Sequence, residues 1–360
     1  MAEAVEQLII TNCRRVMSQL VSRTFNYIRE KRVNRREARG WGMHHRWMWL
    51  ISTVFTLMLI ATAPMALAAT ATQKSFASPE AGVTALVEAL KVNDQPMLRE
   101  ILGPHGKKLI SSGDTVADQQ NREAFIKAYG ETNKLVLEGD RQAVLVIGQD
   151  EWPLPIPLVK SSAGWRFDTP QGEKEILARR IGRNELSAIQ VCLAIVDAAH
   201  EYATLDVDGD GIPEYAQQFV SKPGKHDGLY WKTKPDEPLS PLGPLLAAAT
   251  NEGYTNSVTK PLAPYHGYFY RILMKQGKDA RDGAHDYLIN GHMIGGFAVI
   301  AYPARYGASG IMSFMVNQDG LVYEQNLGKN TAAIAAKMNA FNPDPNWTQS
   351  APSPILVNTH

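Results

Sequence analysis

A long helical pattern occupies the middle of the chain and ends in an acidic loop. Within residues 172–219 the apolar positions recur at three-, four- and five-residue steps, and they are Ile176, Leu177, Ile181, Leu186, Ile189, Leu193 and Val196. This spacing predicts one helix of roughly thirty residues with a single apolar stripe, whereas an ordinary globular helix has about eleven or twelve. A helix of this length either connects two domains or is the spine of one.

The region before the helix, residues 75–170, is predicted to be a small α+β domain. Ser78, Pro79 and Glu80 are typical of a helix start, with a side-chain cap, a proline in the first turn and an early acid. Two further helices are expected near residues 97–102 and 122–129. Strand-like runs follow at residues 134–138, 143–147, 156–160 and 165–168, with turn residues between them. Helices followed by an antiparallel meander are typical of the α+β class.

The second region, residues 171–341, is predicted to pack the long helix on an antiparallel sheet. Its expected strands are residues 267–275, 296–302, 311–316 and 321–324, and a helix is expected at residues 329–339. Asp319 and Gly320 supply the turn of one hairpin. Residues 342–360 are rich in proline and asparagine and are predicted to form a loose tail.

The first 69 residues are predicted to concern targeting. An apolar run over residues 47–63 follows Arg46 and ends near Ala66, Leu67 and Ala68, which is the pattern of a secretory signal peptide at residues 43–69. Cleavage near Ala68 is expected, and an uncleaved membrane anchor is the alternative. Residues 1–42 are interpreted as upstream sequence or a basic leader. The chain is therefore predicted to be periplasmic or otherwise exported, with membrane contact only through an uncleaved signal segment.

The charge balance argues against nucleic acid as a partner. Of the 37 basic and 36 acidic residues, ten and four lie in residues 1–46, which leaves 27 and 32 and a net charge of −5 for the rest. A mildly acidic body without a basic patch is not typical of a nucleic-acid-binding protein. Cys192 is the single cysteine after the leader, and its apolar neighbours predict a buried, inert thiol.

The acidic loop is the strongest chemical signal in the sequence. Asp206, Asp208, Asp210 and Gly211 match the D-x-D-x-D-G opening of a calcium-binding loop. The twelfth position is glutamine in this chain, so Glu214 is the nearest acid to complete a metal site. We therefore predict structural Ca²⁺ at Asp206, Asp208, Asp210 and Glu214, and the alternative is a solvated turn that only ends the helix.

Several short segments, widely spaced along the chain, form a recognisable combination. They are residues 179–186 (RRIGRNEL), the acidic loop, residues 227–231 (DGLYW), residues 295–298 (GGFA) and residues 314–323 (FMVNQDGLVY). Together they resemble the DUF2950 family of exported bacterial proteins of unknown function. That resemblance implies an envelope location and supplies no catalytic residues.

Two looser resemblances concern folds. Residues 164–167 (GWRF) close a meander that resembles the cone-shaped fold of nuclear transport factor 2 and ketosteroid isomerase relatives, although no catalytic carboxylate pair is assigned. Residues 184–189 (NELSAI) resemble the helix of pilin-like and pseudopilin domains, which lies across a sheet. In this chain a whole domain precedes that helix, unlike in pilins.

These patterns lead to two functional hypotheses. The first is an exported, non-catalytic envelope protein of unknown function, a binding or assembly module with calcium as a structural ion and an envelope protein or small molecule as partner. The alternative is a small-molecule-binding protein or hydrolase that uses a pocket in the N-terminal domain or near His226. Charged groups beside a deep apolar cleft would favour the alternative.

Overall fold

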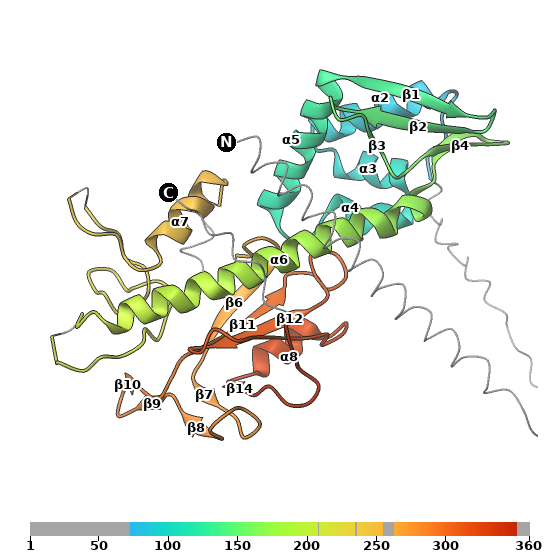
Figure 1. Cartoon of the computed structure of the whole chain (residues 1–360). Helices are drawn as coiled ribbons and strands as arrows, with labels where there is room; N and C mark the ends of the chain where they lie inside the picture. Colours follow the sequence, from blue (N-terminus) through green and yellow to red (C-terminus); the bar gives the residue numbers. More distant parts are fainter. Residues whose placement is uncertain (1–72, 208, 235, 255–262, 351–360) are drawn as a thin grey trace, which may run out of the picture. The chain divides into compact units, whose positions relative to one another are not determined.

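The predicted long helix is the central element of the structure. Helix α6 runs from Thr169–Ala203 over 35 residues and ends directly before the acidic loop. The computed structural model describes residues 73–207, 209–234, 236–254 and 263–350. The predicted leader (1–42), the signal peptide (43–69) and Asp208 lie outside the described residues. Figure 1 shows α6 passing beside α4 and then along strands β6, β11 and β12.

Short helices form the first part of the fold, and local capping explains where they begin. They are α2 (Pro79–Lys91), α3 (Gln95–Leu102), the 3-10 helix η1 (Pro104–Gly106), α4 (Lys107–Ile110) and α5 (Thr115–Glu131). The side chains of Ser78, Asp94 and Asp114 each accept a hydrogen bond from a backbone N–H in the first turn of the helix that follows. The expected start at Ser78 is confirmed.

An antiparallel sheet packs against these helices. Its strands are β1 (Asn133–Glu138), β2 (Gln142–Ile147), β3 (Trp152–Pro153), β4 (Leu158–Ser161) and β5 (Gly164–Phe167), in the order β1-β2-β4-β5 with β3 paired to β2. Leu145, Leu158 and Phe167 from the sheet and Leu98 and Ile101 from α3 are almost fully buried in one hydrophobic core.

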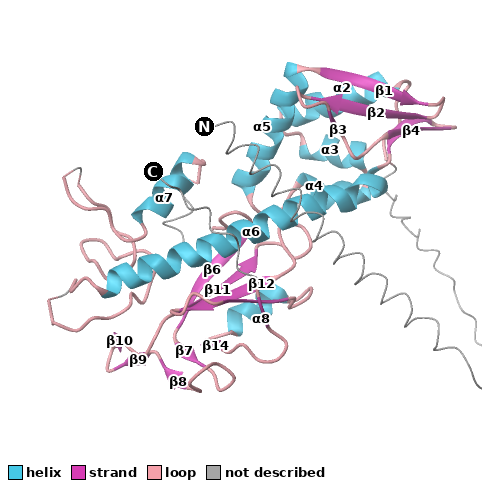
Figure 2. Ribbon diagram, viewed as in Figure 1, coloured by secondary structure: helices cyan, strands magenta, loops and turns pink. Residues whose placement is uncertain are grey.

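A second sheet forms the C-terminal part, with its main strands in the order β15-β13-β12-β11-β6. These are β6 (Tyr268–Leu273), β11 (Ala298–Pro303), β12 (Ser313–Asn317), β13 (Val322–Gln325) and β15 (Thr348–Gln349). The shorter elements are α7 (Gly243–Asn251), β7 (Lys275–Gln276), β8 (His285–Asp286), β9 (Leu288–Ile289), β10 (His292–Met293), α8 (Thr331–Lys337) and β14 (Ala340–Phe341). Helices and mainly antiparallel sheets confirm the predicted α+β class (Figure 2).

Helix α6 packs on the second sheet through small side chains. Ala188, Cys192 and Ala199 share one face of the helix and are fully buried, and α6 contacts β11 and β12. Burial raises the pKa of the Cys192 thiol to about 12; the predicted burial of this thiol is confirmed. Leu193 is only partly buried, although the apolar stripe in the sequence includes it.

The first turns of α6 belong to the other core. Ile176 packs against the cluster formed by the N-terminal helices and sheet. Gly172 lies so close to the preceding loop that a Cβ atom there would sit 2.4 Å from the carbonyl oxygen of Pro155. One helix therefore serves two hydrophobic cores, and all described residues belong to one compact unit. Within the described residues no helix is both long enough and apolar enough to cross a membrane.

A buried carboxylate joins the two halves of the described chain. Asp114 is 1 % exposed; its Oδ1 caps α5, and its Oδ2 accepts hydrogen bonds from the Tyr254 hydroxyl at 3.0 Å and from the Gly267 N–H at 2.8 Å. Gly267 has a φ of +77° and faces the Asn184 side chain at a distance that leaves no room for a Cβ atom. The start of α5 is thus fixed to the segment that leads into β6.

The sequence assigns residues 342–360 to a loose tail, and the structure differs for its first part. Trp347 is 8 % exposed and packs into the C-terminal core, and Thr348 and Gln349 pair with β13 as strand β15. One buried tryptophan and a strand partner are enough to order residues 342–350. Residues 351–360 lie outside the described part of the chain.

Candidate functional site

The acidic loop follows α6 as predicted, and its two described aspartates bond to the loop backbone. An Oδ atom of Asp206 accepts the Gly211 N–H at 3.2 Å, and Asp210 Oδ1 accepts the Ile212 N–H at 2.7 Å. Gly209 and Gly211 have positive φ values of 76° and 79°, which is the backbone conformation that glycine favours. The loop is therefore a tight turn held by its own carboxylates.

Glu214 and Asp210 face a histidine from β10. The Nδ1 atom of His292 lies 3.3 Å from Glu214 Oε2 and 3.5 Å from Asp210 Oδ2, and the same Glu214 oxygen accepts the Met293 N–H. Because Tyr215 N also donates to Met293 O, the end of the loop is attached to the β9–β10 hairpin.

A calcium site requires several oxygen ligands around one cation. The described His, Cys, Asp and Glu side chains include no group of three or more that could hold a metal ion. Asp210 and Glu214 already have partners in His292 and Met293. Asp208, the remaining predicted ligand, lies outside the described residues. Calcium at Asp206, Asp208, Asp210 and Glu214 stays a prediction, which calorimetric titration with calcium would test.

His226, the other predicted site residue, lies on the surface. Its ring stacks on Trp231 with a centroid separation of 4.4 Å, and its carbonyl oxygen accepts the Tyr202 hydroxyl. Neither of the two hollows described below includes it. His226 therefore packs against an aromatic neighbour and lines neither hollow.

The N-terminal region contains an apolar pocket of about 160 Å³ between its helices, the loop after β3 and the start of α6. Its apolar lining is Leu86, Leu90, Leu98, Leu102, Leu109, Ile110, Phe125, Leu154, Ile156 and Ile176, and its polar lining is Asp118, Asn121, Arg122 and Arg180. Apolar walls with a few polar groups are typical of small-molecule sites.

The polar groups of this pocket differ in the hydrogen-bond partners that they have within the chain. Both oxygens of Asp118 accept the Ser112 N–H. Arg180 donates to the carbonyl oxygens of Lys108 and Leu109 at 2.7 and 2.8 Å. Burial lowers the pKa of the Arg180 guanidinium, and the charge of Asp118 opposes this effect. Asp118 and Arg180 therefore both have hydrogen-bond partners within the chain.

Arg122 is the polar residue of the pocket that lacks such partners. Its side chain is partly buried, and within residues 73–207, 209–234, 236–254 and 263–350 it makes no hydrogen bond or ion pair. The charged groups that line the pocket are one carboxylate and two guanidinium groups, which leaves one positive charge in excess.

The sequence suggested a pocket in the N-terminal domain as one alternative, but it did not identify the lining. That lining comes from five helices and one loop, so no single segment of the sequence marks it. Asp118 and Arg122 are four residues apart on α5, so the i, i+4 spacing that places them on one face was available as a signal. That signal is weak, because such pairs are usually solvent-exposed ion pairs.

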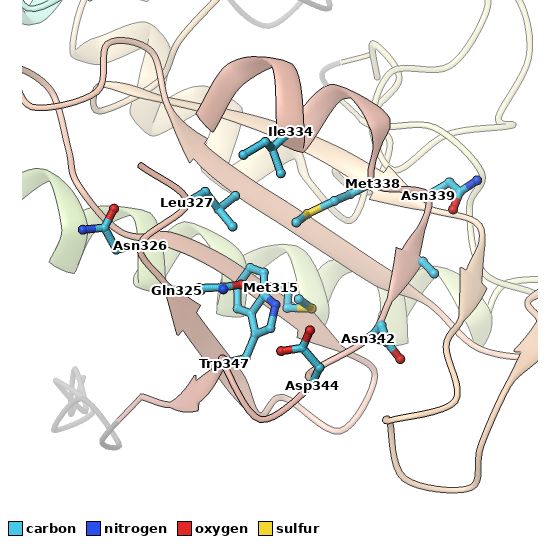
Figure 3. A pocket seen from close by; sticks show the side chains of 11 residues that line it. Met315, Gln325, Asn326, Leu327, Ile334, Met338, Asn339, Asn342, Asp344 and Trp347 are labelled. Carbon is cyan, nitrogen blue, oxygen red and sulfur yellow. The ribbon is translucent and has the colours of Figure 1, made fainter. Parts of the chain in front are cut away.

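A larger and shallower hollow of about 520 Å³ lies beside β13 and α8 (Figure 3). Its apolar lining consists of Met315, Leu327, Ile334, Met338, Ala340 and Trp347. Two of its amides are occupied: Asn326 accepts the Tyr306 hydroxyl, and Asn342 bonds to Asp279. The lining has no positively charged residue, and its one carboxylate belongs to Asp344. This hollow offers less to a ligand than the N-terminal pocket.

The first segment of the recognised combination (RRIGRNEL) fixes contacts between elements. Asn184 donates to the Ser309 carbonyl, and Glu185 accepts the N–H groups of Ile311 and Met312 at 2.9 and 3.0 Å. Burial raises the pKa of Glu185, and the two backbone N–H groups partly oppose this shift. These residues position the segment that leads into β12, so this motif reflects the architecture of the protein.

The fold and the pocket together describe an α+β protein in which one long helix joins two cores and borders an apolar pocket. A family model described as a protein of unknown function (DUF2950) matches residues 73–350. The chain belongs to the DUF2950 family, as the combination of short segments indicated. No curated protein and no solved structure matches the chain, so the likenesses to the nuclear transport factor 2 fold and to pilin-like domains stay predictions.

Proposed function

We propose that this protein is an exported, non-catalytic binding protein whose ligand site is the N-terminal apolar pocket. The observation that carries the proposal is an apolar pocket of about 160 Å³ with charged side chains in its lining. Such a pocket supports small-molecule binding over a purely structural or assembly role.

The size of the pocket limits the ligand. A cavity of roughly 150 Å³ lined by leucine, isoleucine and phenylalanine is large enough to bind benzene, and drug-sized ligands occupy about 300–1,000 Å³. A single ring or a short acyl chain therefore fits, with each buried methylene contributing about 0.8 kcal/mol.

Binding is proposed in preference to catalysis because of the chemistry of the lining. The described side chains around the pocket include no serine, cysteine or histidine. The one carboxylate, Asp118, accepts a backbone N–H on both oxygens and lies near Arg180. These hydrogen bonds hold Ser112 in the segment before α5. A carboxylate engaged in this way is poorly placed to remove a proton from a ligand.

Filling the pocket is expected to abolish binding. Leu109 is partly buried and lines the pocket from α4, so Leu109→Trp places an indole ring in the space that a ligand needs. Benzyl alcohol is a suitable probe, and the unmutated protein should bind it with a Kd in the millimolar range or below, about −4 kcal/mol. Isothermal titration calorimetry measures this affinity, and Leu109→Trp should lose it.

A matched control adds the same side chain outside the pocket. Leu137 on β1 is 64 % exposed, and Leu137→Trp should leave the affinity for benzyl alcohol unchanged. The proposal is wrong if the unmutated protein does not bind the ring, or if the two tryptophan variants bind it equally well. Thermal melts of both variants establish that each is folded.

The export part of the proposal rests on the sequence. The apolar run after Arg46 and the Ala66 to Ala68 ending support cleavage by signal peptidase. Protein isolated from its native host should begin close to Ala69 in N-terminal sequencing. A mature chain that still begins at Met1 or Met43 would contradict this.

A further inference from the structure

We propose that the ligand of the N-terminal pocket is a short amphiphilic monocarboxylate, with its apolar body inside the pocket and its carboxylate paired with Arg122. This inference rests on the proposed function and adds the chemical class of the ligand.

The charges around the pocket argue for an anion. Asp118 accepts the Ser112 N–H on both oxygens, and Arg180 donates to two carbonyl oxygens, so both residues already have partners within the chain. Arg122 lines the same pocket and has no hydrogen-bond or ion-pair partner among the described residues. A partly buried guanidinium without a counter-ion attracts a carboxylate, because its N–H groups can bond to both carboxylate oxygens.

A neighbouring arginine adds to the positive potential on the same side. Arg183 donates to the side-chain oxygen of Asn121, which also lines the pocket, at 3.2 Å. The pocket is therefore lined or bordered by Arg122, Arg180 and Arg183 against one carboxylate. An anionic ligand is attracted to such a site, whereas a cation is repelled.

The apolar volume excludes a large amphiphile. About 160 Å³ accommodates one ring or a chain of a few carbons, and a membrane lipid or long-chain fatty acid is far larger. Among the residues that line the pocket itself, one positive charge is in excess, and it matches one carboxylate better than a doubly charged phosphate. These two limits together give an aromatic or short aliphatic monocarboxylic acid.

The test compares two probes with the same ring and different charge, benzoate and benzyl alcohol, by calorimetric titration of the folded protein. Benzoate is expected to bind at least about tenfold more tightly, because a hydrogen bond to a charged partner contributes more than a neutral one. Its affinity should fall with added salt, and that of benzyl alcohol should not.

Arg122→Gln should remove the preference for benzoate over benzyl alcohol, and Arg122→Lys should keep part of that preference. Arg99→Gln is the matched control, since Arg99 is exposed on α3 and does not line the pocket. Without ligand, Arg122→Gln should melt like the unmutated protein, because Arg122 has no partner to lose among the described residues.

Two results would overturn the inference while the proposed function stands: equal affinity for both probes, or a benzoate preference that survives Arg122→Gln. Tighter binding of hexadecanoate than of benzoate would also overturn it, since that result would indicate a lipid chain as ligand. If neither ring binds, the proposed function itself is wrong and this inference is lost with it.

Discussion

Replacing Asp114 with alanine is expected to lower the free energy of unfolding by about 3–5 kcal/mol. The change leaves three donors without their acceptor: the N–H of Ala117, the hydroxyl of Tyr254 and the N–H of Gly267. A buried donor left unpaired costs about 1–3 kcal/mol. Burial, followed by the charge of Asp114, raises the pKa of Tyr254, so this hydroxyl remains a donor at all ordinary pH values.

Asp94→Ala is the matched control, because Asp94 caps α3 through the Met97 N–H, and that is its one side-chain hydrogen bond among the described residues. Loss of a cap alone costs about 1 kcal/mol. Urea denaturation of both variants measures the difference. Tyr254→Phe removes one donor from the cluster, so Asp114→Ala should be less harmful in that background than in the unmutated protein. Equal losses for Asp94→Ala and Asp114→Ala would show that Asp114 is only a cap.

Ala199→Asp on α6 is expected to prevent cooperative folding of the C-terminal core. Ala199 is fully buried, and its face of the helix, shared with Ala188 and Cys192, packs on the second sheet. A carboxylate at this position has no partner, and burying an unpaired charge costs several kcal/mol in practice. The methyl group of alanine also leaves little space for a longer side chain in a close-packed core.

Gln190→Asp is the control, since Gln190 is exposed on the same helix and receives the same new residue. Circular dichroism melts should show a normal transition for Gln190→Asp and a lost or strongly lowered one for Ala199→Asp. Leu193→Asp should lie between them, because Leu193 is only partly buried. A normal melting transition for Ala199→Asp would contradict the packing of α6 on the sheet.

The sequence alone determined the backbone plan. The long apolar periodicity, the cap at Ser78 and the alternating strand runs were sufficient to predict α6, α2 and the two antiparallel sheets, because helix and strand periods depend on local geometry. The turn at Asp319 and Gly320 was likewise visible, since a positive φ at glycine is a local property. The family was also predicted from short segments, and the match over residues 73–350 confirms it.

The sequence identified part of the buried face of α6. Of the predicted stripe, Leu177, Ile181, Ile189 and Val196 are buried, whereas Ile176, Leu186 and Leu193 are only partly buried. The fully buried residues include Ala188 and Ala199, whose small side chains allow the helix to approach the sheet. Hydrophobicity alone ranks leucine above alanine, whereas the distance between a helix and a sheet favours the smaller residue.

Only the tertiary structure decided the candidate site. The pocket exists because α2, α3, α4, α5 and the start of α6 leave a space that their side chains do not fill, and the sequence does not encode such a space as a motif. Asp118, Arg122 and Arg180 acquire different roles there: Asp118 and Arg180 have hydrogen-bond partners within the chain, and Arg122 has none among the described residues. In the sequence all three are ordinary charged residues on helices. Long-range packing sets their burial and their partners, and it is burial and partners that distinguish a binding residue from a solvated one.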